Sequence, residues 1–315
     1  MIRIFIKDES FNIRILTEIP QNINLNNILW IDLMSPTEDE KQWTENTFNI
    51  HFPSKQEMEE IEISSRYWED EETITINAYF LVHEAEGAKN ETVTFILTLN
   101  TLITIRYREL RTFSEVVKRI MSNPRHFEDG YYILASILDI RIDSDADTLE
   151  FITKEITKLS RLVFTGIDIT QQILESISYY EDYNMTIREN LMDKQRLLSA
   201  LLKSYKVPKP LREEFRIMIK DVNSLIDYAN FNFDRLDYLQ NTFLGLLNIE
   251  QNKVMKIFTL MSVIFLPPTL IAAIYGMNFQ YMPELSWKYG YPLALILMVL
   301  SAITPLYIFK KKGWL

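Results

Sequence analysis

Two uncharged stretches near the C-terminus decide the architecture of this 315-residue chain. IFTLMSVIFLPPTLIAAIY covers Ile257–Tyr275, and YPLALILMVLSAITPLYIF covers Tyr291–Phe309. As a helix, each stretch would extend about 28 Å, close to the roughly 30 Å hydrocarbon core of a bilayer. Helices of a soluble core rarely stay uncharged on every face over this length. The sequence therefore predicts two membrane-spanning helices.

Basic residues lie before the first stretch and after the second, at the ends that are farther from the loop connecting them. Lys253 and Lys256 precede the first stretch, and Lys310–Lys312 follow the second. The positive-inside rule places both flanks in the cytoplasm and the connector outside. The start, MIRIFIKDES, becomes charged at once and does not resemble a signal peptide, so residues 1–252 are expected to be cytoplasmic. We expect a multi-pass protein of the cell inner membrane, with both termini in the cytoplasm and the lipid bilayer as a partner.

The composition excludes several functional classes. The net charge is −10, and residues 1–252 hold 42 acidic and 27 basic side chains, which disfavours nucleic acid and favours cations as partners. Cysteine is absent, so disulfides, thiol nucleophiles and cysteine-ligated zinc are excluded. Neighbouring glycines are never closer than 14 residues, so no nucleotide-binding loop is predicted. We expect no organic cofactor.

Residues 1–125 alternate β-rich and helical segments. The expected strands are Ile2–Ile6, Phe11–Leu16, Leu29–Leu33, Thr73–Val82, Glu91–Leu99 and Leu102–Tyr107. The expected helices are Thr37–Thr47, Ser54–Glu60 and Glu109–Met121, the first of them opened by Ser35 and Pro36. The strands are rich in β-branched and aromatic residues. The sequence predicts a cytoplasmic α/β domain in which helices flank a mixed sheet.

Long helices follow this domain. Apolar residues recur at helical spacing over Asp129–Phe164 and Ile167–Lys206, which predicts a helical hairpin over residues 126–210. Proline is then absent from Leu211 until Pro267, so we expect one helix with a stalk over 211–256 and the first span over 257–275. A loop over 276–290, the second span over 291–309 and a basic cytoplasmic tail over 310–315 complete the expected organisation.

A polar stripe follows the stalk helix into the first span. Steps of three and four residues, which keep one helix face toward the axis of a left-handed bundle, select the stripe. It consists of Asn241, Gly245, Asn248, Asn252, Met255, Thr259, Ser262, Leu266, Thr269 and Ala273. We interpret it as a pore lining that Met255 and Leu266 narrow. Two spans cannot enclose a water-filled pore alone, so this interpretation requires an oligomer. The alternative is that small polar residues let spans pack closely.

The first span ends in a specific motif. Tyr275–Phe279 reads YGMNF, and Met282–Leu285 reads MPEL with Glu284 in the outer loop. We expect Gly276 to end the helix at its C′ position and Asn278 to present an amide oxygen at the outer mouth. With FLPPTL at Phe265–Leu270 and the tail KKKGWL, these residues resemble the CorA family of magnesium channels, whose signature is the tripeptide Gly276-Met277-Asn278.

The resemblance implies a funnel-shaped homopentamer with first spans around one central pore. It implies that Gly276, Met277 and Asn278 form the selectivity filter. The pore and gate residues, from the resemblance and the stripe together, are Asn252, Met255, Phe258, Thr259, Ser262, Leu266 and Thr269. The implied function is influx of Mg²⁺, and also of Co²⁺ and Ni²⁺, down the electrochemical gradient. Divalent cations are the implied partners, and Mg²⁺ is both the transported and the regulatory ion.

The cytoplasmic regulatory site departs from the family pattern. The family pattern has an aspartate in the stalk helix and a second aspartate that faces the pore. When the pattern is aligned on Gly276 without gaps, this sequence has Ile217 and Asn241 at those two positions. The remaining candidate ligands are Asp221, Asp139, Asp143, Asp145, Glu84 and Glu86. Each has the alternative interpretation of an ordinary solvated carboxylate.

Two other functions stay open from the sequence. One is a transporter of Zn²⁺ or another transition metal on the same scaffold, although Met277 in the middle of the tripeptide favours magnesium. The other is a membrane-anchored cytosolic enzyme or scaffold, with His51, His83 and His126 as the acid–base candidates. An anchor would not need a polar stripe.

Overall fold

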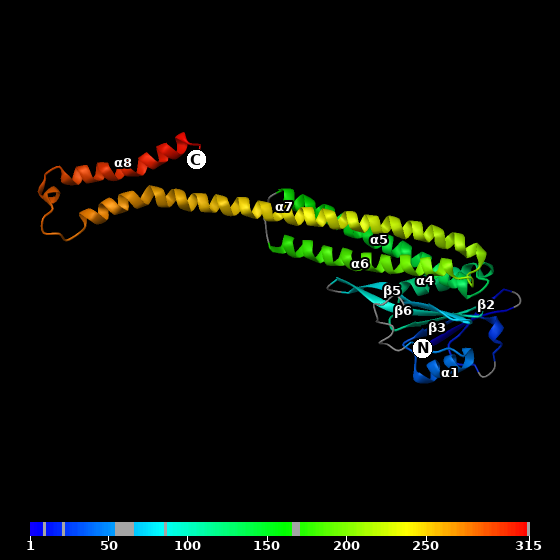
Figure 1. The fold of residues 1–315 in the computed structure, drawn as a ribbon. Helices are drawn as coiled ribbons and strands as arrows, with labels where there is room; N and C mark the ends of the chain where they lie inside the picture. The colour runs from blue at the N-terminus through cyan, green and yellow to red at the C-terminus, as the bar shows by residue number, and fades with distance from the viewer. Residues whose placement is uncertain (9–10, 21–22, 54–65, 85–86, 166–170, 314–315) are drawn as a thin grey trace. The chain divides into compact units, whose positions relative to one another are not determined.

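The structure is a computed structural model that describes residues 1–8, 11–20, 23–53, 66–84, 87–165 and 171–313. The chain divides into two compact units, Met1–Gln240 and Asn241–Leu315, and each is described by itself. Figure 1 labels the elements along the chain. The expected helix Ser54–Glu60 and the candidate ligand Glu86 lie outside the described residues.

The described strands of the first unit form a seven-stranded mixed sheet in the order β2-β1-β3-β7-β6-β5-β4. The strands are β1 Ile2–Lys7, β2 Ile13–Leu16, β3 Ile28–Met34, β4 Tyr67–Glu69, β5 Thr73–Glu84, β6 Gly87–Thr98 and β7 Thr101–Arg106. β3 and β7 run parallel, and the other neighbouring strands run antiparallel. The predicted mixed sheet is confirmed, whereas the short strand β4 was not expected.

A residue in the left-handed conformation sets the start of β2 and the end of β6, and both strand ends therefore differ from the expected ones. Phe11 has φ 61° and its N–H donates to the Asp8 carbonyl at 3.0 Å, so β2 begins at Ile13. Leu99 has φ 51° and is 70% exposed in the turn between β6 and β7. Phe11 and Leu99 were expected in strands because they are apolar, but both lie in turns.

Helix α1 (Glu38–Phe48) is capped by Thr37, not by Ser35. Thr37 Oγ1 accepts the Glu40 N–H at 3.3 Å, and Glu40 Oε2 accepts the Thr37 N–H at 2.9 Å, which is a capping box. Ser35 has φ 43°, and its hydroxyl donates to the Tyr107 carbonyl at 3.2 Å. The expected cap at Ser35 is therefore wrong, because Ser35 belongs to the preceding turn.

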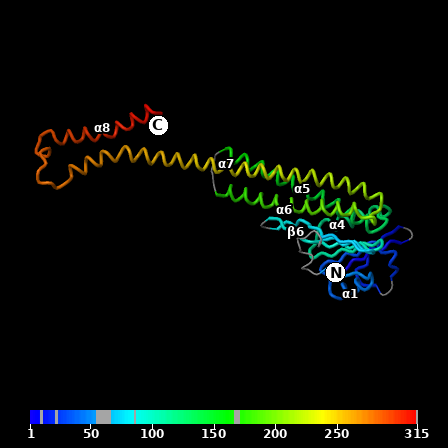
Figure 2. Tube along the Cα trace, viewed as in Figure 1, coloured from blue at the N-terminus to red at the C-terminus, as the bar shows by residue number. Residues whose placement is uncertain are grey.

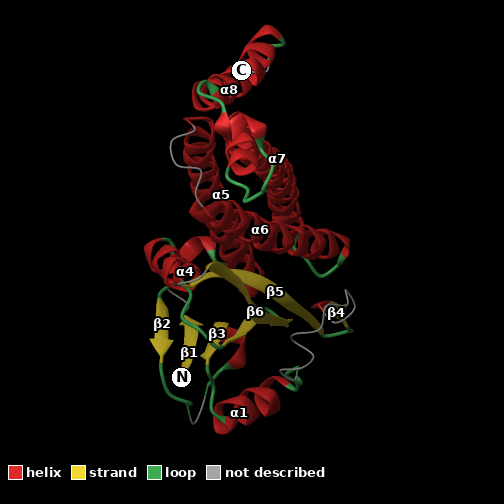
Figure 3. Ribbon diagram, turned by 90° about the vertical axis from the view of Figure 1, so that its left-hand side faces the viewer, coloured by secondary structure: helices red, strands yellow, loops and turns green. Residues whose placement is uncertain are grey.

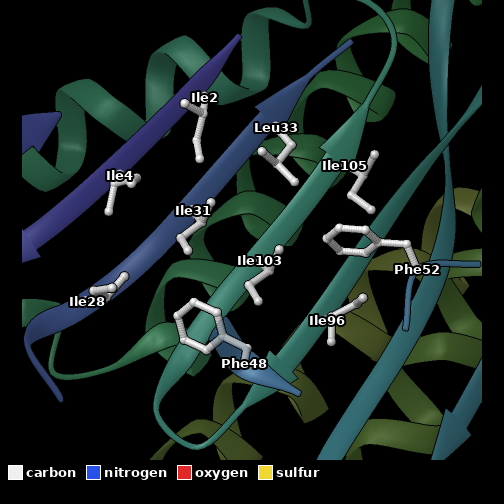
Figure 4. Packing of buried hydrophobic residues seen from close by; sticks show 10 residues of the cluster. All are labelled: Ile2, Ile4, Ile28, Ile31, Leu33, Phe48, Phe52, Ile96, Ile103 and Ile105. Carbon is white, nitrogen blue, oxygen red and sulfur yellow. The ribbon is translucent and has the colours of Figure 1, made fainter. Parts of the chain in front are cut away.

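Hydrophobic residues pack on both faces of the sheet. Figure 4 shows the cluster on the α1 face, which consists of Ile2, Ile4, Ile28, Ile31, Leu33, Phe48, Phe52, Ile96, Ile103 and Ile105. Another cluster is aromatic, with Phe5 stacked on Trp30 at 4.5 Å between ring centroids and Phe113 of α4 (Arg111–Ser122) 5.9 Å from Trp30. Figure 3 shows α1 on one side of the sheet and α4 to α6 on the other.

Three long helices complete the first unit. α5 spans Gly130–Thr165, α6 spans Gln171–Lys203, and α7 begins at Lys209. α5 and α6 pack against each other, and the first part of α7 buries one apolar side, on which Phe215, Val222 and Leu236 are fully buried. The tube in Figure 2 follows these helices along the chain.

The second unit contains the two uncharged stretches. α7 continues without interruption to Tyr275 with Pro267 and Pro268 inside it, a short 3₁₀ helix (η3) covers Pro283–Ser286, and α8 covers Gly290–Lys311. Among the helices that the structure describes, α7 and α8 are long and apolar enough to cross a membrane. Their apolar segments are almost entirely unburied within the chain. Surfaces of this kind need lipid or further copies of the chain to cover them.

Candidate functional site

The first span has one side turned toward α8. In Figure 1, α8 runs back along the C-terminal part of α7. The partly buried residues of α7 recur at helical spacing and are Leu260, Val263, Ile264, Pro267, Pro268, Ile271 and Tyr275. On α8, Ala294 is buried with 5% exposure. Because α8 is the other long helix of this unit, we assign this side of α7 to packing between the two spans.

The polar stripe lies on the opposite side of the first span. Thr259, Ser262, Leu266, Thr269 and Ala273 are all exposed within the chain. At 100° per residue, the centre of this stripe points about 160° away from the centre of the α8-facing side. The partly buried side of the first span does not include these polar residues, so burial within the described residues does not account for them.

The hydroxyl groups of the stripe bond to their own helix. Thr259 Oγ1 donates to the Met255 carbonyl at 2.8 Å, Ser262 Oγ to the Phe258 carbonyl at 3.0 Å and Thr269 Oγ1 to the Phe265 carbonyl at 2.7 Å. Each hydroxyl hydrogen is thus occupied, and only oxygen lone pairs remain to face the surroundings. Oxygen acceptors suit the waters around a cation, which point their hydrogens outward.

Apolar residues alternate with these hydroxyl groups. Met255, Phe258 and Leu266 are 58%, 66% and 65% exposed within the chain. Asn252 is exposed one turn before Met255. The residues that the structure describes leave these apolar side chains largely uncovered, so a second protein surface or lipid must cover them.

The tripeptide Gly276-Met277-Asn278 follows directly on the last residue of α7. The Gly276 N–H donates to the Ala272 carbonyl at 2.9 Å and the Met277 N–H to the Ile274 carbonyl at 3.3 Å, so the helix tightens as it ends. Gly276 does not have the positive φ that a C′ glycine usually adopts, which corrects the expected cap geometry. Gly276, Met277 and Asn278 are exposed.

Glu284 lies in η3 and is exposed. It is the single acidic residue in the sequence from Lys253 to Leu315. Its carbonyl oxygen accepts the Trp287 N–H at 3.4 Å, so its backbone belongs to a folded loop that leads into α8.

Asp139 and Asp221, two of the candidate regulatory ligands, line one cleft of about 600 Å³ in the first unit. Asp139 Oδ2 accepts a hydrogen bond from Arg119 Nη1 at 2.7 Å. Ile217, where the family pattern would place an acid, lines the same cleft and is 51% exposed. The structure therefore brings Asp139 and Asp221 together, with Arg119 already bound to one of them.

Asp143 and Asp147 line an adjoining cleft of about 460 Å³. Asp143 is exposed, and partial burial followed by the charge of Asp139 raises its pKa above the usual value, with Asp147 and Asp221 adding to the effect. The acids of this region thus repel one another. Within the described ranges, no group of three His, Asp or Glu side chains is close enough to hold a metal ion.

Two further candidates have partners in the fold. Asp145 is fully buried, with Arg141 Nε donating to Oδ1 at 2.8 Å and Lys194 Nζ lying 3.0 Å from Oδ2. Both oxygens therefore already face cations, which supports an internal ion pair for Asp145. Glu84 is 43% exposed and lies 2.9 Å from Arg108.

The histidines occupy different surroundings. His51 is 90% exposed beside Glu45, and His126 contacts Phe127 and Tyr132 through their rings. His83 Nδ1 lies 2.5 Å from the Tyr183 hydroxyl, and its pKa is lowered by burial and by Arg141.

Buried charged side chains that were not identified from the sequence form hydrogen bonds with the backbone at the outer edge of β5. β4 pairs with β5 over Ile74–Ile76. Beyond that point, Arg66 Nη1 donates to the Asn77 carbonyl at 3.3 Å, Lys194 Nζ to the Tyr79 carbonyl at 3.1 Å and Arg141 Nη1 to the Leu81 carbonyl at 3.2 Å. The Tyr79 N–H donates to Asp193 Oδ2 at 2.9 Å.

No described strand pairs with β5 beyond Ile76, and these side chains bond to its backbone there, which protects an exposed sheet edge. The signal in the sequence was the occurrence of Arg141 and Lys194 among apolar residues at core-facing helical positions.

Comparisons with known proteins agree on one family. Residues 26–311 match the model of the CorA-like Mg²⁺ transporter protein family. The chain is 45% identical over 321 residues to the magnesium transport protein CorA of Wolinella succinogenes, with all of both chains covered. It is also 45% identical over 309 residues to that of Campylobacter jejuni, covering 95% of this chain and 93% of the relative.

A solved structure extends the likeness to three dimensions. The complete CorA magnesium transporter of Methanocaldococcus jannaschii superposes with a TM-score of 0.83 at 26% identity, covering 100% of this chain and 99% of that one. The family consists of ion transporters and not of enzymes. The match over nearly the whole chain shows that the protein belongs to the CorA-like Mg²⁺ transporter family.

Proposed function

We propose that this chain is the subunit of a homopentameric channel that conducts Mg²⁺, and also Co²⁺ and Ni²⁺, into the cell down the electrochemical gradient. The observation that carries the proposal is the polar stripe, which faces away from α8 and runs to Gly276-Met277-Asn278. The number of subunits follows the resemblance to the family. The relatives named magnesium transport proteins support Mg²⁺ as the main ion.

In the proposed pore, Gly276, Met277 and Asn278 form the selectivity filter. Mg²⁺ releases its waters reluctantly. A ring of Asn278 amide oxygens can accept hydrogen bonds from these waters without stripping the ion. A membrane potential supplies about 4.6 kcal/mol per 100 mV for two charges, so influx needs no nucleotide.

Met255, Phe258 and Leu266 form the proposed gate, and Asn252, Thr259, Ser262 and Thr269 form the proposed polar rings. Their exposure within one chain supports a location on a surface shared by several copies. When apolar rings approach the axis, they expel water and close the pore.

Cytoplasmic Mg²⁺ is the proposed regulator. The grouping of Asp139 and Asp221 in one cleft, with Asp143 and Asp147 in the next, supports a site here, because a divalent cation would relieve the repulsion among these acids. Asp139, Asp143 and Asp221 are the preferred ligands, supplemented from a neighbouring subunit, since one described chain does not gather three acids. We propose that the protein lies in the inner membrane with both termini in the cytoplasm.

Uptake into liposomes tests the filter assignment. Wild type should take up Mg²⁺, and Asn278→Ala should lower selective uptake by at least about tenfold, because it removes the ring of amide oxygens. Thr304→Val is a matched control, since Thr304 bonds to the Leu300 carbonyl at 2.7 Å on the other span. Equal selective uptake by wild type and Asn278→Ala would reject the assignment.

Competition by hexaamminecobalt(III) separates Mg²⁺ from Zn²⁺ transport. This complex resembles hydrated Mg²⁺ and should inhibit uptake if the ion passes with its waters. Uptake of Zn²⁺ that is indifferent to the complex would instead support a route for a dehydrated transition metal.

A further inference from the structure

Gly290, the first residue of α8, makes a contact that no other residue type could make. It is buried, although the loop residues before it are exposed. A Cβ atom placed on Gly290 would lie 2.1 Å from the Glu284 carbonyl oxygen and 3.2 Å from the Glu284 carbonyl carbon. The obstructing atoms belong to backbone and cannot rotate away. Gly290 does not have a positive φ, so the requirement is for close approach and not for backbone conformation.

Backbone hydrogen bonds hold residues 282–290 in a compact loop at this contact. The Leu285 N–H donates to the Met282 carbonyl at 3.2 Å, the Trp287 N–H to the Glu284 carbonyl at 3.4 Å and the Gly290 N–H to the Trp287 carbonyl at 2.9 Å. The Trp287 and Tyr289 rings meet edge to face at 6.0 Å. The segment Met282–Gly290, here called the outer loop, is therefore folded on itself and joined to the first turn of α8.

The contact involves the residue that carries the negative charge of this region. Glu284 supplies both the carbonyl group against Gly290 and the single acidic side chain between Lys253 and Leu315. A displacement of the Glu284 backbone must move its carboxylate as well. A fixed anion at a channel entrance raises the local concentration of cations and the rate at which they arrive.

We propose that Gly290 is a positioning residue for cation entry. Its lack of a side chain allows the outer loop to close against α8, and this closure holds the Glu284 carboxylate at the entrance. The inference rests on the proposed function, because it takes the outer loop as the side from which the cation enters.

The experiment measures Mg²⁺ uptake into liposomes as a function of Mg²⁺ concentration at low and high ionic strength. Gly290→Ala and Glu284→Gln should each raise the half-saturating Mg²⁺ concentration by about threefold at low ionic strength, with the maximal rate nearly unchanged. The effect should shrink at high ionic strength, because salt screens the carboxylate. Tyr291→Ala is the control, since Tyr291 is 77% exposed and the change adds no atom against Glu284.

The double variant Gly290→Ala/Glu284→Gln distinguishes positioning from a general structural role. If Gly290 acts through Glu284, the double variant should resemble either single variant and not exceed it. Additive effects, an unchanged half-saturating concentration in Gly290→Ala, or an effect insensitive to salt would overturn the proposal.

Hydrogen exchange of the wild type keeps the proposal testable if Gly290→Ala does not assemble. The Trp287 and Gly290 amides should exchange more slowly than that of Tyr281, whose side chain is 93% exposed. Equal exchange rates would overturn the closed outer loop. Absence of Mg²⁺ uptake by wild type would reject the proposed function, whatever the exchange rates are.

Discussion

At the scale of the residue, Lys194 is a fully buried ammonium group in contact with the Tyr79 carbonyl, the Asn190 side chain and Asp145. Burial lowers its pKa, and the charge of Asp145 opposes this effect. Its environment explains why a charged residue is tolerated in the core. Lys194 donates a hydrogen bond to a backbone carbonyl at the outer edge of β5, and it faces a buried carboxylate. Removing Lys194 leaves the buried Tyr79 carbonyl and Asp145 Oδ2 without this donor, while Arg141 still pairs with Asp145 Oδ1.

Lys194→Met should therefore lower the free energy of unfolding by about 1–3 kcal/mol, the cost of leaving buried acceptors without a hydrogen bond. The matched control is Lys154→Met, because Lys154 lies 2.7 Å from Glu150 in an ion pair whose side chains are 66% and 64% exposed. That change should have little effect on stability, because water and salt screen an exposed ion pair. Denaturant unfolding of the detergent-solubilised protein measures both variants, and equal small losses would contradict the role given to Lys194.

His83 predicts a pH dependence of stability. Burial first and Arg141 second lower the pKa of His83 below its usual value, while Asp145 raises it. A lowered pKa in the folded state means that the contribution of neutral His83 is fully present above about pH 6.5 and is lost as the pH falls through the folded pKa. The melting temperature should thus fall between pH 7 and pH 5, and less steeply in His83→Gln. Parallel curves for the two proteins would argue against this contribution.

At the scale of the element, α5 is held to the sheet at its first residue. The Gly130 N–H donates to the Asn100 carbonyl at 2.7 Å. A Cβ atom on Gly130 would lie 2.3 Å from the Leu102 nitrogen and 2.7 Å from the Thr101 carbonyl carbon. The start of α5 therefore approaches the turn between β6 and β7 at a distance that only glycine permits.

Gly130→Ala should destabilise the protein by about 1–3 kcal/mol, because the obstructing atoms are backbone and the helix must shift. Gly245→Ala is the matched control. Gly245 also lies in a helix, but a Cβ atom there would meet no other atom within 4 Å. This substitution should be neutral or stabilising by about 0.5–1 kcal/mol. Thermal unfolding of both variants measures the difference, and a neutral Gly130→Ala would show that the contact adapts.

At the scale of the whole molecule, two helices are long and apolar enough to cross a membrane, and the first unit carries most of the acidic residues. In the topology that we propose, Lys253, Lys256 and Lys310–Lys312 lie at the cytoplasmic ends of the spans, as the positive-inside rule predicts. The same proposal places the outer loop outside the cytoplasm.

The absence of cysteine from the sequence makes this orientation directly testable. Ser286→Cys in the outer loop should react with a membrane-impermeant maleimide on intact spheroplasts. Phe11→Cys in the first unit, where Phe11 is 49% exposed, should react only after lysis. The reverse pattern of labelling would invert the proposed topology.

The sequence alone determined the two spans, the single long helix, the mixed sheet and the tripeptide at the end of the first span. These features depend on local hydrophobicity, helical spacing and adjacent residues, which a linear sequence records. It could not place Asp145, Glu284 or Gly290, because their surroundings come from residues distant along the chain or from a loop closing on itself.

Only the tertiary structure decided that Asp145 is paired with Lys194 as well as with Arg141, that the polar stripe stays uncovered and that Gly290 meets the Glu284 backbone. The physical reason is that burial and close approach are properties of packed pairs, which no single position in a sequence encodes.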